Sequence, residues 1–220
     1  MENNFLDKQI IKVRMKKIVL SLVAIAFVLL SFTTADKNTE VAMNVSDLSE
    51  ITFDGNVDVE SSVLYWKGKK PTGSHNGTVK LKEGSMKVKK GKIKSGEFVI
   101  DMTTIKDTDG SKRLEGHLSS ADFFDVKKFP TSKFVISKTK KQGDKISVTG
   151  DLTIKGVTKS ITFPATISEE DGVVTFKSET FEVNRANFNV RYGSKSFFGN
   201  LKNKFINDMM EMSFEVKVKS

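Results

Sequence analysis

The chain has 220 residues, a formal net charge of +9 and no cysteine. The absence of cysteine excludes a disulfide framework, and a chain of this length can bury enough apolar surface to fold without one. The lysines are spread along the sequence and no DNA- or RNA-binding motif accompanies them. The charge therefore indicates a solvated surface and no nucleic-acid partner.

The first 35 residues have the order of a secretory signal peptide. A basic block ends at Lys17, an apolar run from Ile18 to Phe32 follows, and small residues end the segment at Ala35. The run is short for a membrane span, which needs about 20 residues, and an uncleaved anchor is the alternative. Met15 is an alternative start of the chain. We expect cleavage near Ala35 and a periplasmic or otherwise extracytoplasmic protein.

Residues 36–52 are polar with scattered apolar positions, which predicts a spacer before a domain that spans residues 53–220. Within that domain, residues 210–219 alternate apolar and polar side chains almost without error. This period of two is typical of an antiparallel strand with one buried face. Residues 97–102 follow the same rule, with Phe98 and Ile100 on the apolar face.

Further strands are expected where short alternating runs are separated by turn residues. An odd-numbered apolar face is formed by Val57, Val59, Val63 and Tyr65. The other candidate strands are residues 77–82, 131–139, 145–151, 157–167 and 172–183. The expected connections are Gly84-Ser85, Gln142-Gly143-Asp144, Lys155-Gly156 and Asp171-Gly172. The apolar phase slips near Ser178 to Thr180, which predicts a bulge or a bend.

About eight short strands in series predict an all-β fold, a single antiparallel eight-stranded barrel, with a sandwich as the alternative. Periodicity alone does not choose between them. Two segments interrupt the strands. The first lies between Asp101 and Phe134 and predicts a short helix at residues 111–119 and a turn at 122–126. The second, residues 191–208, predicts another short helical insertion.

Several blocks of this domain resemble the YceI family of lipocalin-like extracytoplasmic proteins. The blocks are His75-Asn76-Gly77, Val99-Ile100-Asp101-Met102, Leu114 to Leu118, Asp122 to Asp125, Phe129-Pro130-Thr131, Gly150 to Lys159, and Val183 to Phe188. Their order over about 160 residues makes the likeness specific. The resemblance implies a lipocalin-like barrel that holds a polyisoprenoid or similar lipid without covalent chemistry.

Such a ligand requires an apolar lumen, and the abundance of Phe and Met suits a lining that needs few hydrogen bonds. For any single Phe, filling of the core is the simpler explanation. We expect the lining to come from Trp66, Phe98, Ile100, Phe124, Phe134, Ile136, Leu152, Phe163, Phe176, Phe181, Phe188 and Met210. The sequence does not say which face of each strand points inward.

Four polar residues of the family blocks stand out: His75, Asp101, His117 and Arg185. We expect the two histidines to make structural hydrogen bonds. Asp101 should cap the following turn or pair with Arg113 or Arg185. Because no H-x-H, H-x-x-x-H or H-E-x-x-H spacing occurs, a metal would need carboxylates such as Asp101 or Glu115 beside a histidine. We therefore expect no metal site.

The residues and the resemblance together predict a non-enzymatic exported binding protein. Its ligand would be a long-chain isoprenoid, polyprenyl or quinone-like, held for transport, storage or stress protection, with no other cofactor. We expect a monomer or homodimer that touches the membrane surface transiently. One alternative is an exported enzyme that acts on a lipid-like substrate through Asp101 and His117. The other is a filled barrel with a structural or interaction role.

Overall fold

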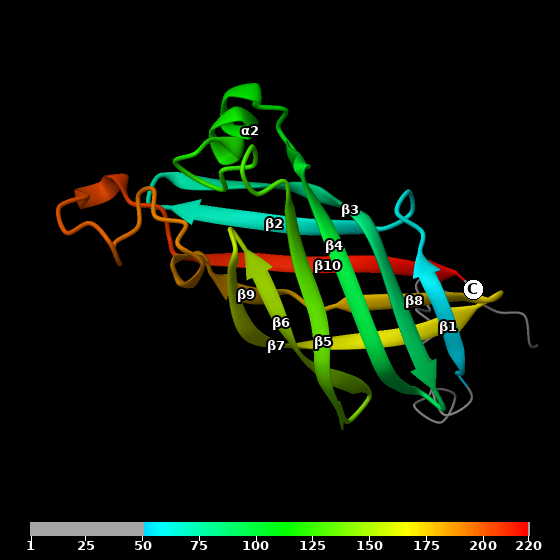
Figure 1. Ribbon diagram of the computed structural model, residues 1–220. Coiled ribbons are helices and arrows are strands. Elements are labelled where there is room, and N and C mark those ends of the chain that lie inside the picture. The colour runs from blue at the N-terminus through cyan, green and yellow to red at the C-terminus, as the bar shows by residue number, and fades with distance from the viewer. Residues whose placement is uncertain (1–50, 220) are drawn as a thin grey trace, which may run out of the picture. The chain divides into compact units, whose positions relative to one another are not determined.

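A computed structural model describes residues 51–219 (Figure 1). The predicted signal peptide, residues 1–35, lies outside these residues, as does most of the predicted spacer. The described part holds one α-helix, α2 (Lys112–Ser119), and two short 3-10 helices, η2 (Arg185–Phe188) and η3 (Lys202–Lys204). The strands are β1 (Phe53–Val57), β2 (Val63–Lys70), β3 (Gly73–Lys89), β4 (Lys92–Asp107), β5 (Thr131–Gln142), β6 (Lys145–Ile154), β7 (Val157–Glu170), β8 (Val173–Ser178), β9 (Phe181–Asn184) and β10 (Met209–Lys219).

The strands close into an antiparallel ring. Each strand from β2 to β8 pairs with the next one along the chain, and β10 pairs with both β8 and β2 to complete the circle. β1 and β2 pair in turn with β3 and β10, so they occupy one position in the wall. β8 and β9 share another position, because both pair with β10. The ten strands thus form eight positions, which confirms the predicted eight-stranded barrel.

The predicted strands from residue 77 to residue 167 fall within observed ones, and the run 172–183 is divided into β8 and β9 at Ser178 to Thr180, where a bulge or bend was expected. Three of the four predicted turns are hairpins. The fourth, Gly84-Ser85, is wrong, because these residues lie inside β3. The pairing of β3 with β4 shifts register between Leu81 and Glu83, so β3 bends just before this pair and continues without a turn.

The faces of the strands follow the predicted alternation with one exception. Phe98 and Ile100 of β4 and Val216 and Val218 of β10 are buried, as expected. The odd-numbered face proposed for residues 57–65 fails in β2, where Tyr65 is 47% exposed. Residues 58–62 interrupt the strand, and pairing of Trp66 with Met212 and Gly77 then sets the inward face on the even numbers.

One end of the barrel is a solid core. Near the β3–β4 hairpin, side chains from four strands meet with almost no exposed surface: Met86, Val88, Val148, Val174 and Val218. Close packing of this kind stabilises the ring and leaves no room for a ligand. The space inside the barrel must therefore lie toward the other end.

Both insertions lie at that other end (Figure 1). The predicted helix is confirmed as α2, whose N-cap Ser111 accepts a hydrogen bond from the Leu114 N–H. The second insertion contains only the three-residue helix η3. The two insertions touch, since the ring centroids of His117 and Tyr192 are 4.4 Å apart.

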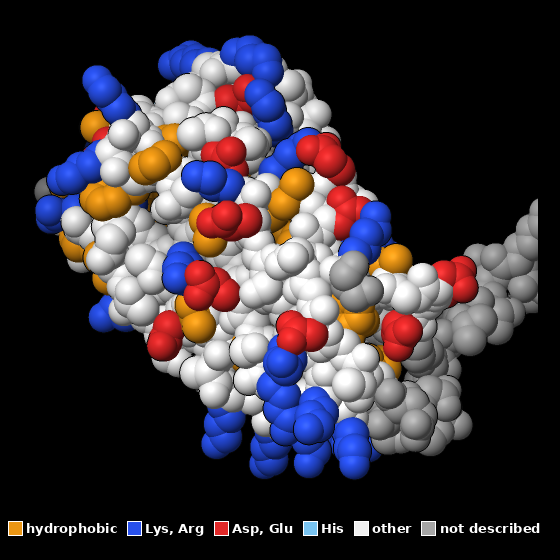
Figure 2. Space-filling view, turned by 45° about the vertical axis from the view of Figure 1, so that its right-hand side comes forward, with side chains coloured by type: hydrophobic (Ala, Val, Ile, Leu, Met, Phe, Trp, Pro, Cys, Tyr) orange, Lys and Arg blue, Asp and Glu red, His pale blue; other side chains and the backbone are white. Residues whose placement is uncertain are grey.

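The outer wall carries both signs of charge. Cross-strand ion pairs join Lys177 to Glu215 and Lys133 to Glu97, and Figure 2 shows acidic and basic side chains interspersed over this face. Exposed pairs of this kind stabilise a fold by about 1 kcal/mol or less. Among residues 51–219, no helix has the length and apolar character that a membrane crossing requires.

Candidate functional site

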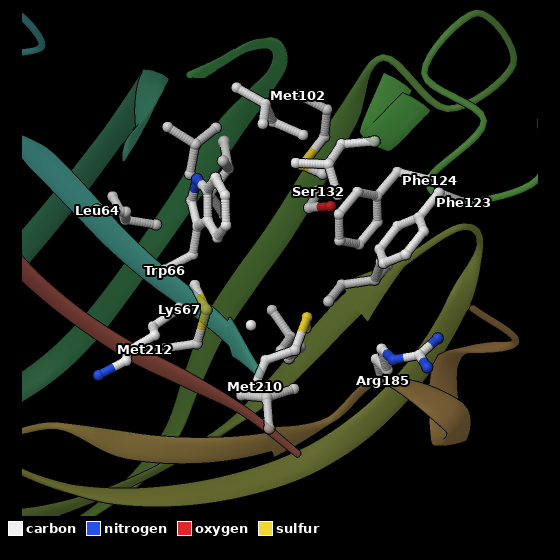
Figure 3. Close-up of a pocket in the computed structure, with 18 of the residues that line it drawn as sticks. Leu64, Trp66, Lys67, Met102, Phe123, Phe124, Ser132, Arg185, Met210 and Met212 are labelled. Carbon is white, nitrogen blue, oxygen red and sulfur yellow. The ribbon is translucent and has the colours of Figure 1, made fainter. Parts of the chain in front are cut away.

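The barrel encloses an apolar cavity in two compartments. The insert-side compartment has a volume of 130 Å³ and is bounded partly by the insertions, through Leu118, Phe123, Phe124 and Ile206. The inner compartment has a volume of 80 Å³ and lies toward the solid core. The two compartments share five wall residues: Leu64, Ile100, Leu152, Val183 and Met212. Figure 3 shows how Leu64, Trp66 and Met212 surround the insert-side compartment.

The structure brings ten of the twelve predicted lining residues to this cavity. Trp66, Phe124 and Met210 line the insert-side compartment, Ile100 and Leu152 line both, and the inner one adds Phe98, Phe134, Phe163, Phe176 and Phe181. Ile136 and Phe188 line neither. Ile136 packs against the backbone of Gly96. Phe188 belongs to η2, after the strand has ended, and is buried in the core.

Sequence reasoning missed the rest of the lining. Met102, Met212 and Phe214 lie on the same apolar faces as the predicted Ile100 and Met210, so the alternation of those strands was the available signal. Leu64 lies on the even-numbered face of β2, opposite to the face that was expected to be apolar. Ile206 and Asn207 come from the second insertion, where no period applies. The apolar residues of that insertion were the available signal, but they do not say which of them turn inward.

Stacked phenylalanines form the wall of the inner compartment. The Phe163 and Phe181 rings stack with centroids 4.5 Å apart, and Phe214 meets Phe163 edge-on at 5.5 Å and Phe176 at 4.9 Å. Such pairs contribute about 0.5–1.5 kcal/mol beyond the area that they bury. The rings need no hydrogen-bond partner, so the compartment presents only apolar surface to its contents.

Two glycines of the family blocks allow this packing. A Cβ atom on Gly150 would lie 2.4 Å from the Phe134 ring, which therefore rests on the bare backbone of β6. A Cβ on Gly77 would lie 1.8 Å from the Lys106 carbonyl oxygen and 2.6 Å from the Trp66 ring. Glycine at these positions lets two lining aromatic rings approach the neighbouring strands.

Arg185 is the one fully buried arginine of the described residues, and it lies at the edge of the insert-side compartment. Its guanidinium donates hydrogen bonds to the carbonyl oxygens of Asn207, Val190 and Ile206 at 3.1, 2.8 and 3.0 Å. Its Nη2 lies 3.2 Å from Asp208 Oδ1. The predicted partner Asp101 is therefore wrong, and Arg185 serves to fasten the second insertion to the barrel.

Burial lowers the pKa of Arg185, while the Asp208 charge opposes this shift. Burial alone would raise the pKa of Asp208. Hydrogen bonds from Ser194 and Ser196 and the charge of Arg185 outweigh that effect, so the pKa of Asp208 lies below its ordinary value. Both groups are therefore charged at neutral pH, and the pair is stable there.

The other polar residues lie apart from one another. Asp101 Oδ1 accepts hydrogen bonds from the N–H and the hydroxyl of Thr103, at 3.0 and 2.6 Å. Both residues lie inside β4, which continues to Asp107, so the expected cap of a following turn is wrong. The His117 ring packs edge-on against Phe123 and Tyr192. The Ser120 hydroxyl donates to the His117 carbonyl oxygen at 2.7 Å and not to its ring. Within residues 51–219, no ion pair or hydrogen bond joins Asp101 to His117.

A family model described as a YceI-like domain matches residues 55–218, which include every strand of the barrel wall after the first residues of β1. This chain belongs to the YceI family. Among curated relatives, UPF0312 proteins of Pseudomonas putida F1 and Pseudomonas fluorescens are 41% and 38% identical to it over 96 residues. That stretch is 43% of this chain, and the chain spans about half the length of these relatives.

Solved structures share this fold. Burkholderia cenocepacia BcnA is 27% identical, with a TM-score of 0.62, over 73% of this chain and 98% of that one. A polyisoprenoid-binding domain of Saccharophagus degradans, implicated in plant cell wall breakdown, has a TM-score of 0.57 over 77% of this chain and 99% of its own. At 13% identity, the second likeness shows the fold alone.

In this YceI domain, the family block Gly150 to Lys159 contacts the block Asp122 to Asp125 at the cavity wall. The Lys155 ammonium, from the β6–β7 turn, donates a hydrogen bond to the Phe123 carbonyl oxygen at 2.7 Å. Phe123 and Phe124 pack edge-on with centroids 5.0 Å apart, and both line the insert-side compartment. The contact holds the first insertion over the cavity, with its two phenylalanines in the wall.

Proposed function

We propose that this protein is an exported binding protein that holds the chain of a long isoprenoid lipid, polyprenyl or quinone-like, for transport, storage or stress protection. The observation that carries the proposal is the wall of the two adjoining compartments, which is apolar from Trp66 near the insertions to Phe176 at the inner end. Each methylene group moved from water into such a wall contributes about 0.8 kcal/mol to binding.

The cavity must widen to accept a long chain. A dry apolar cavity of about 150 Å³ holds a molecule of the size of benzene, and the insert-side compartment measures 130 Å³. Its wall contains Met102, Met210 and Met212, whose unbranched side chains change rotamer more readily than branched ones. We infer that methionine movement admits the rest of the lipid chain.

The polar groups near the cavity favour a ligand with a neutral head group. Arg185 is already engaged by three carbonyl oxygens and Asp208. Figure 3 shows the Lys67 ammonium directed away from the cavity. A phosphate in the cavity would lose its water without gaining a cation in return, which is costly. A quinone-like head group is uncharged, so it loses much less hydration free energy on entering the cavity.

The function proposed is binding without chemistry. A hydrolase or isomerase would need a base and a nucleophile or acid within reach of one another. The Asp101 carboxylate is occupied by Thr103, and the Ser120 hydroxyl is occupied by a backbone carbonyl. These contacts favour a structural role for the residues on which the enzyme alternative depends.

The second insertion supports transient contact with an anionic membrane surface. Residues 191–208 carry four basic residues, Arg191, Lys195, Lys202 and Lys204, and a single acidic one, Asp208, which is paired with Arg185. Phe198 and Tyr192 in the same segment are 46% and 45% exposed. Each basic residue near an anionic surface contributes about 1 kcal/mol. Since Ile206 lines the cavity, docking here would bring the lumen next to the bilayer.

The extracytoplasmic location rests on the N-terminal sequence pattern.

One alternative has a specific observation in its favour. The solid core near the β3–β4 hairpin and the modest cavity volumes favour a filled barrel with a structural role. The Saccharophagus degradans domain is described as polyisoprenoid-binding, but its likeness carries only the fold to this chain. A direct binding measurement must therefore decide between the two.

Trp66 provides that measurement, because it is the only tryptophan of the chain and it lines the cavity. We expect a prenylated quinone to quench its fluorescence saturably, and the same quinone ring without a prenyl tail to have little effect. Met212→Lys should abolish the saturable quenching, whereas Tyr65→Lys, on the outer face of β2, should preserve it. Equal quenching by both quinones, or by both variants, would refute binding in the lumen.

A further inference from the structure

Three potential metal ligands meet outside the cavity, at the junction of β3, β4 and α2. His75 belongs to β3, Asp107 is the last residue of β4, and Asp109 lies in the turn before α2. One ligand atom from each residue lies within 4.8 Å of the other two. His75 Nδ1 is 3.5 Å from Asp107 Oδ1. None of the three residues lines either compartment of the lumen.

Asp107 is buried with half of its hydrogen-bonding capacity unused. Its side chain is 0% exposed. Oδ2 accepts a hydrogen bond from the Ser111 N–H at 3.1 Å. Oδ1 has no hydrogen-bond partner among residues 51–219, and neither does His75 Nδ1, which faces it. A buried carboxylate oxygen without a partner is costly, so a group that binds both atoms at once would stabilise this arrangement.

The backbone holds these residues in place. The Asp107 N–H donates to Glu115 Oε1 at 3.2 Å, and its carbonyl oxygen accepts from the Gly110 N–H at 3.0 Å. Next to His75, Asn76 is tied to Thr108 by two hydrogen bonds of 2.9 and 3.1 Å. The site is thus preorganised by contacts that do not depend on its occupant, which lowers the cost of binding.

We propose that His75, Asp107 and Asp109 bind a divalent first-row transition-metal ion, such as Zn²⁺. Zinc binds imidazole nitrogen and carboxylate oxygen at about 2.0–2.2 Å, so two ligand atoms on a tetrahedral ion lie about 3.4 Å apart. The 3.5 Å between His75 Nδ1 and Asp107 Oδ1 matches that separation. Two carboxylates balance the charge of the ion, and the imidazole favours zinc over the oxygen-preferring Mg²⁺ and Ca²⁺.

Access and coordination number fit an exchangeable site. The His75 side chain is 38% exposed and Asp109 is exposed, while Asp107 forms the buried floor. Three protein ligands leave a position for water. A bound ion would join β3 to the N-terminus of α2, which begins after Ser111. It would thereby hold the insertion whose Leu118 lines the cavity, yet its binding does not depend on any lipid.

The test is calorimetric titration of the full chain, without an affinity tag and stripped with a chelator, with ZnCl₂. We expect one saturable site. His75→Ala should weaken it by at least about tenfold, because loss of a ligand costs no less than loss of an outer-shell partner. His117→Ala is the matched control, since it removes the only other histidine, and should bind as wild type does. Asp109→Asn, at an exposed position, tests a carboxylate without threatening the fold.

Two results would overturn the proposal. One is the absence of saturable zinc binding, or binding that survives His75→Ala unchanged. The other is an NMR result: the chemical shift of the His75 imidazole nitrogens changes with pH but not on addition of zinc. That result would make the contact between His75 and Asp107 an ion pair and not a metal site. If the three variants melt at the same temperature as the wild-type protein, a loss of zinc binding is not caused by unfolding.

Discussion

Lys155 and Phe123 join two family blocks, Gly150 to Lys159 and Asp122 to Asp125, through a 2.7 Å hydrogen bond from the Lys155 ammonium to the Phe123 carbonyl oxygen. Burial lowers the pKa of Lys155, and the Asp125 charge opposes that shift. The lysine thus gives up part of its hydration to hold the first insertion over the cavity. Two residues that are 32 positions apart in the sequence, each in its own family block, are therefore parts of one structural contact.

Replacing this lysine should loosen the insertion. Lys155→Met keeps most of the side-chain length but leaves the carbonyl oxygen without its charged donor, so we predict a loss of about 1–2 kcal/mol in the free energy of unfolding. Amide hydrogen exchange in residues 120–126 should accelerate. Lys159→Met, at an exposed position of β7, is the control and should change stability by less than about 0.5 kcal/mol. Equal effects of the two variants would show that the contact does not hold the insertion.

The Arg185–Asp208 pair predicts acid sensitivity. Because the pKa of Asp208 in the folded protein lies below its ordinary value of 3.8, the unfolded chain binds more protons there. The contribution of Asp208 to stability is therefore complete above that value, and it is lost as the pH falls through the lowered folded pKa.

Asp208→Asn should remove this pH dependence and leave the buried Arg185 without its counter-charge. We predict a loss of about 3 kcal/mol at neutral pH. The difference between variant and wild type should narrow below pH 4. Urea unfolding at several pH values measures both effects. If the difference in free energy of unfolding between the variant and the wild type stays constant at all acidic pH values, Asp208 does not contribute through its charge.

A bulky residue where the compartments meet should select for short ligands. Leu152 lines both compartments, so Leu152→Trp would place a bulky ring where the two adjoin. We predict that the variant still binds short prenyl analogues but no longer binds long ones. Overpacking should lower its free energy of unfolding by about 1–3 kcal/mol. Asp151→Trp places the same ring on the outer face of β6 and should leave chain-length preference unchanged. Retention of long lipids by Leu152→Trp would exclude the inner compartment as their site.

Membrane contact through the second insertion should depend on its charge and its exposed ring. Lys195→Glu combined with Phe198→Ser should weaken co-sedimentation with phosphatidylglycerol vesicles by about tenfold or more. Lys89→Glu is the control, because it reverses one charge at the exposed β3–β4 hairpin, at the opposite end of the barrel. If this control lowers binding as much as the double variant does, the attraction comes from the whole surface.

The sequence predicted the ring of strands well because a period of two is a local signal. The strand predicted from alternation at residues 210–219 is β10, and three predicted glycine-containing turns are hairpins. Gly84-Ser85 was misjudged because a glycine in a bent strand resembles one in a turn. Tyr65 was misjudged because the inward face of β2 is set by pairing with β10, which lies about 150 residues away along the chain.

The candidate site was predictable only in part, for the same reason. Alternation located Phe98, Ile100 and Met210, whose strands have an evident apolar face. It did not reveal that Asp208 would pair with Arg185, or that Asp107 and Asp109 would lie beside His75. Those contacts join distant segments and arise only when the barrel closes.

Extraction of the purified protein would show whether its lumen holds an isoprenoid lipid. The protein should be purified from the envelope fraction without detergent, extracted with organic solvent, and the extract analysed by mass spectrometry. We predict one polyprenyl or quinone species, near one molecule per chain, and a sharply reduced amount from Met212→Lys. A repeatedly empty extract, or an equal amount from Met212→Lys, would contradict the claim and favour the filled barrel.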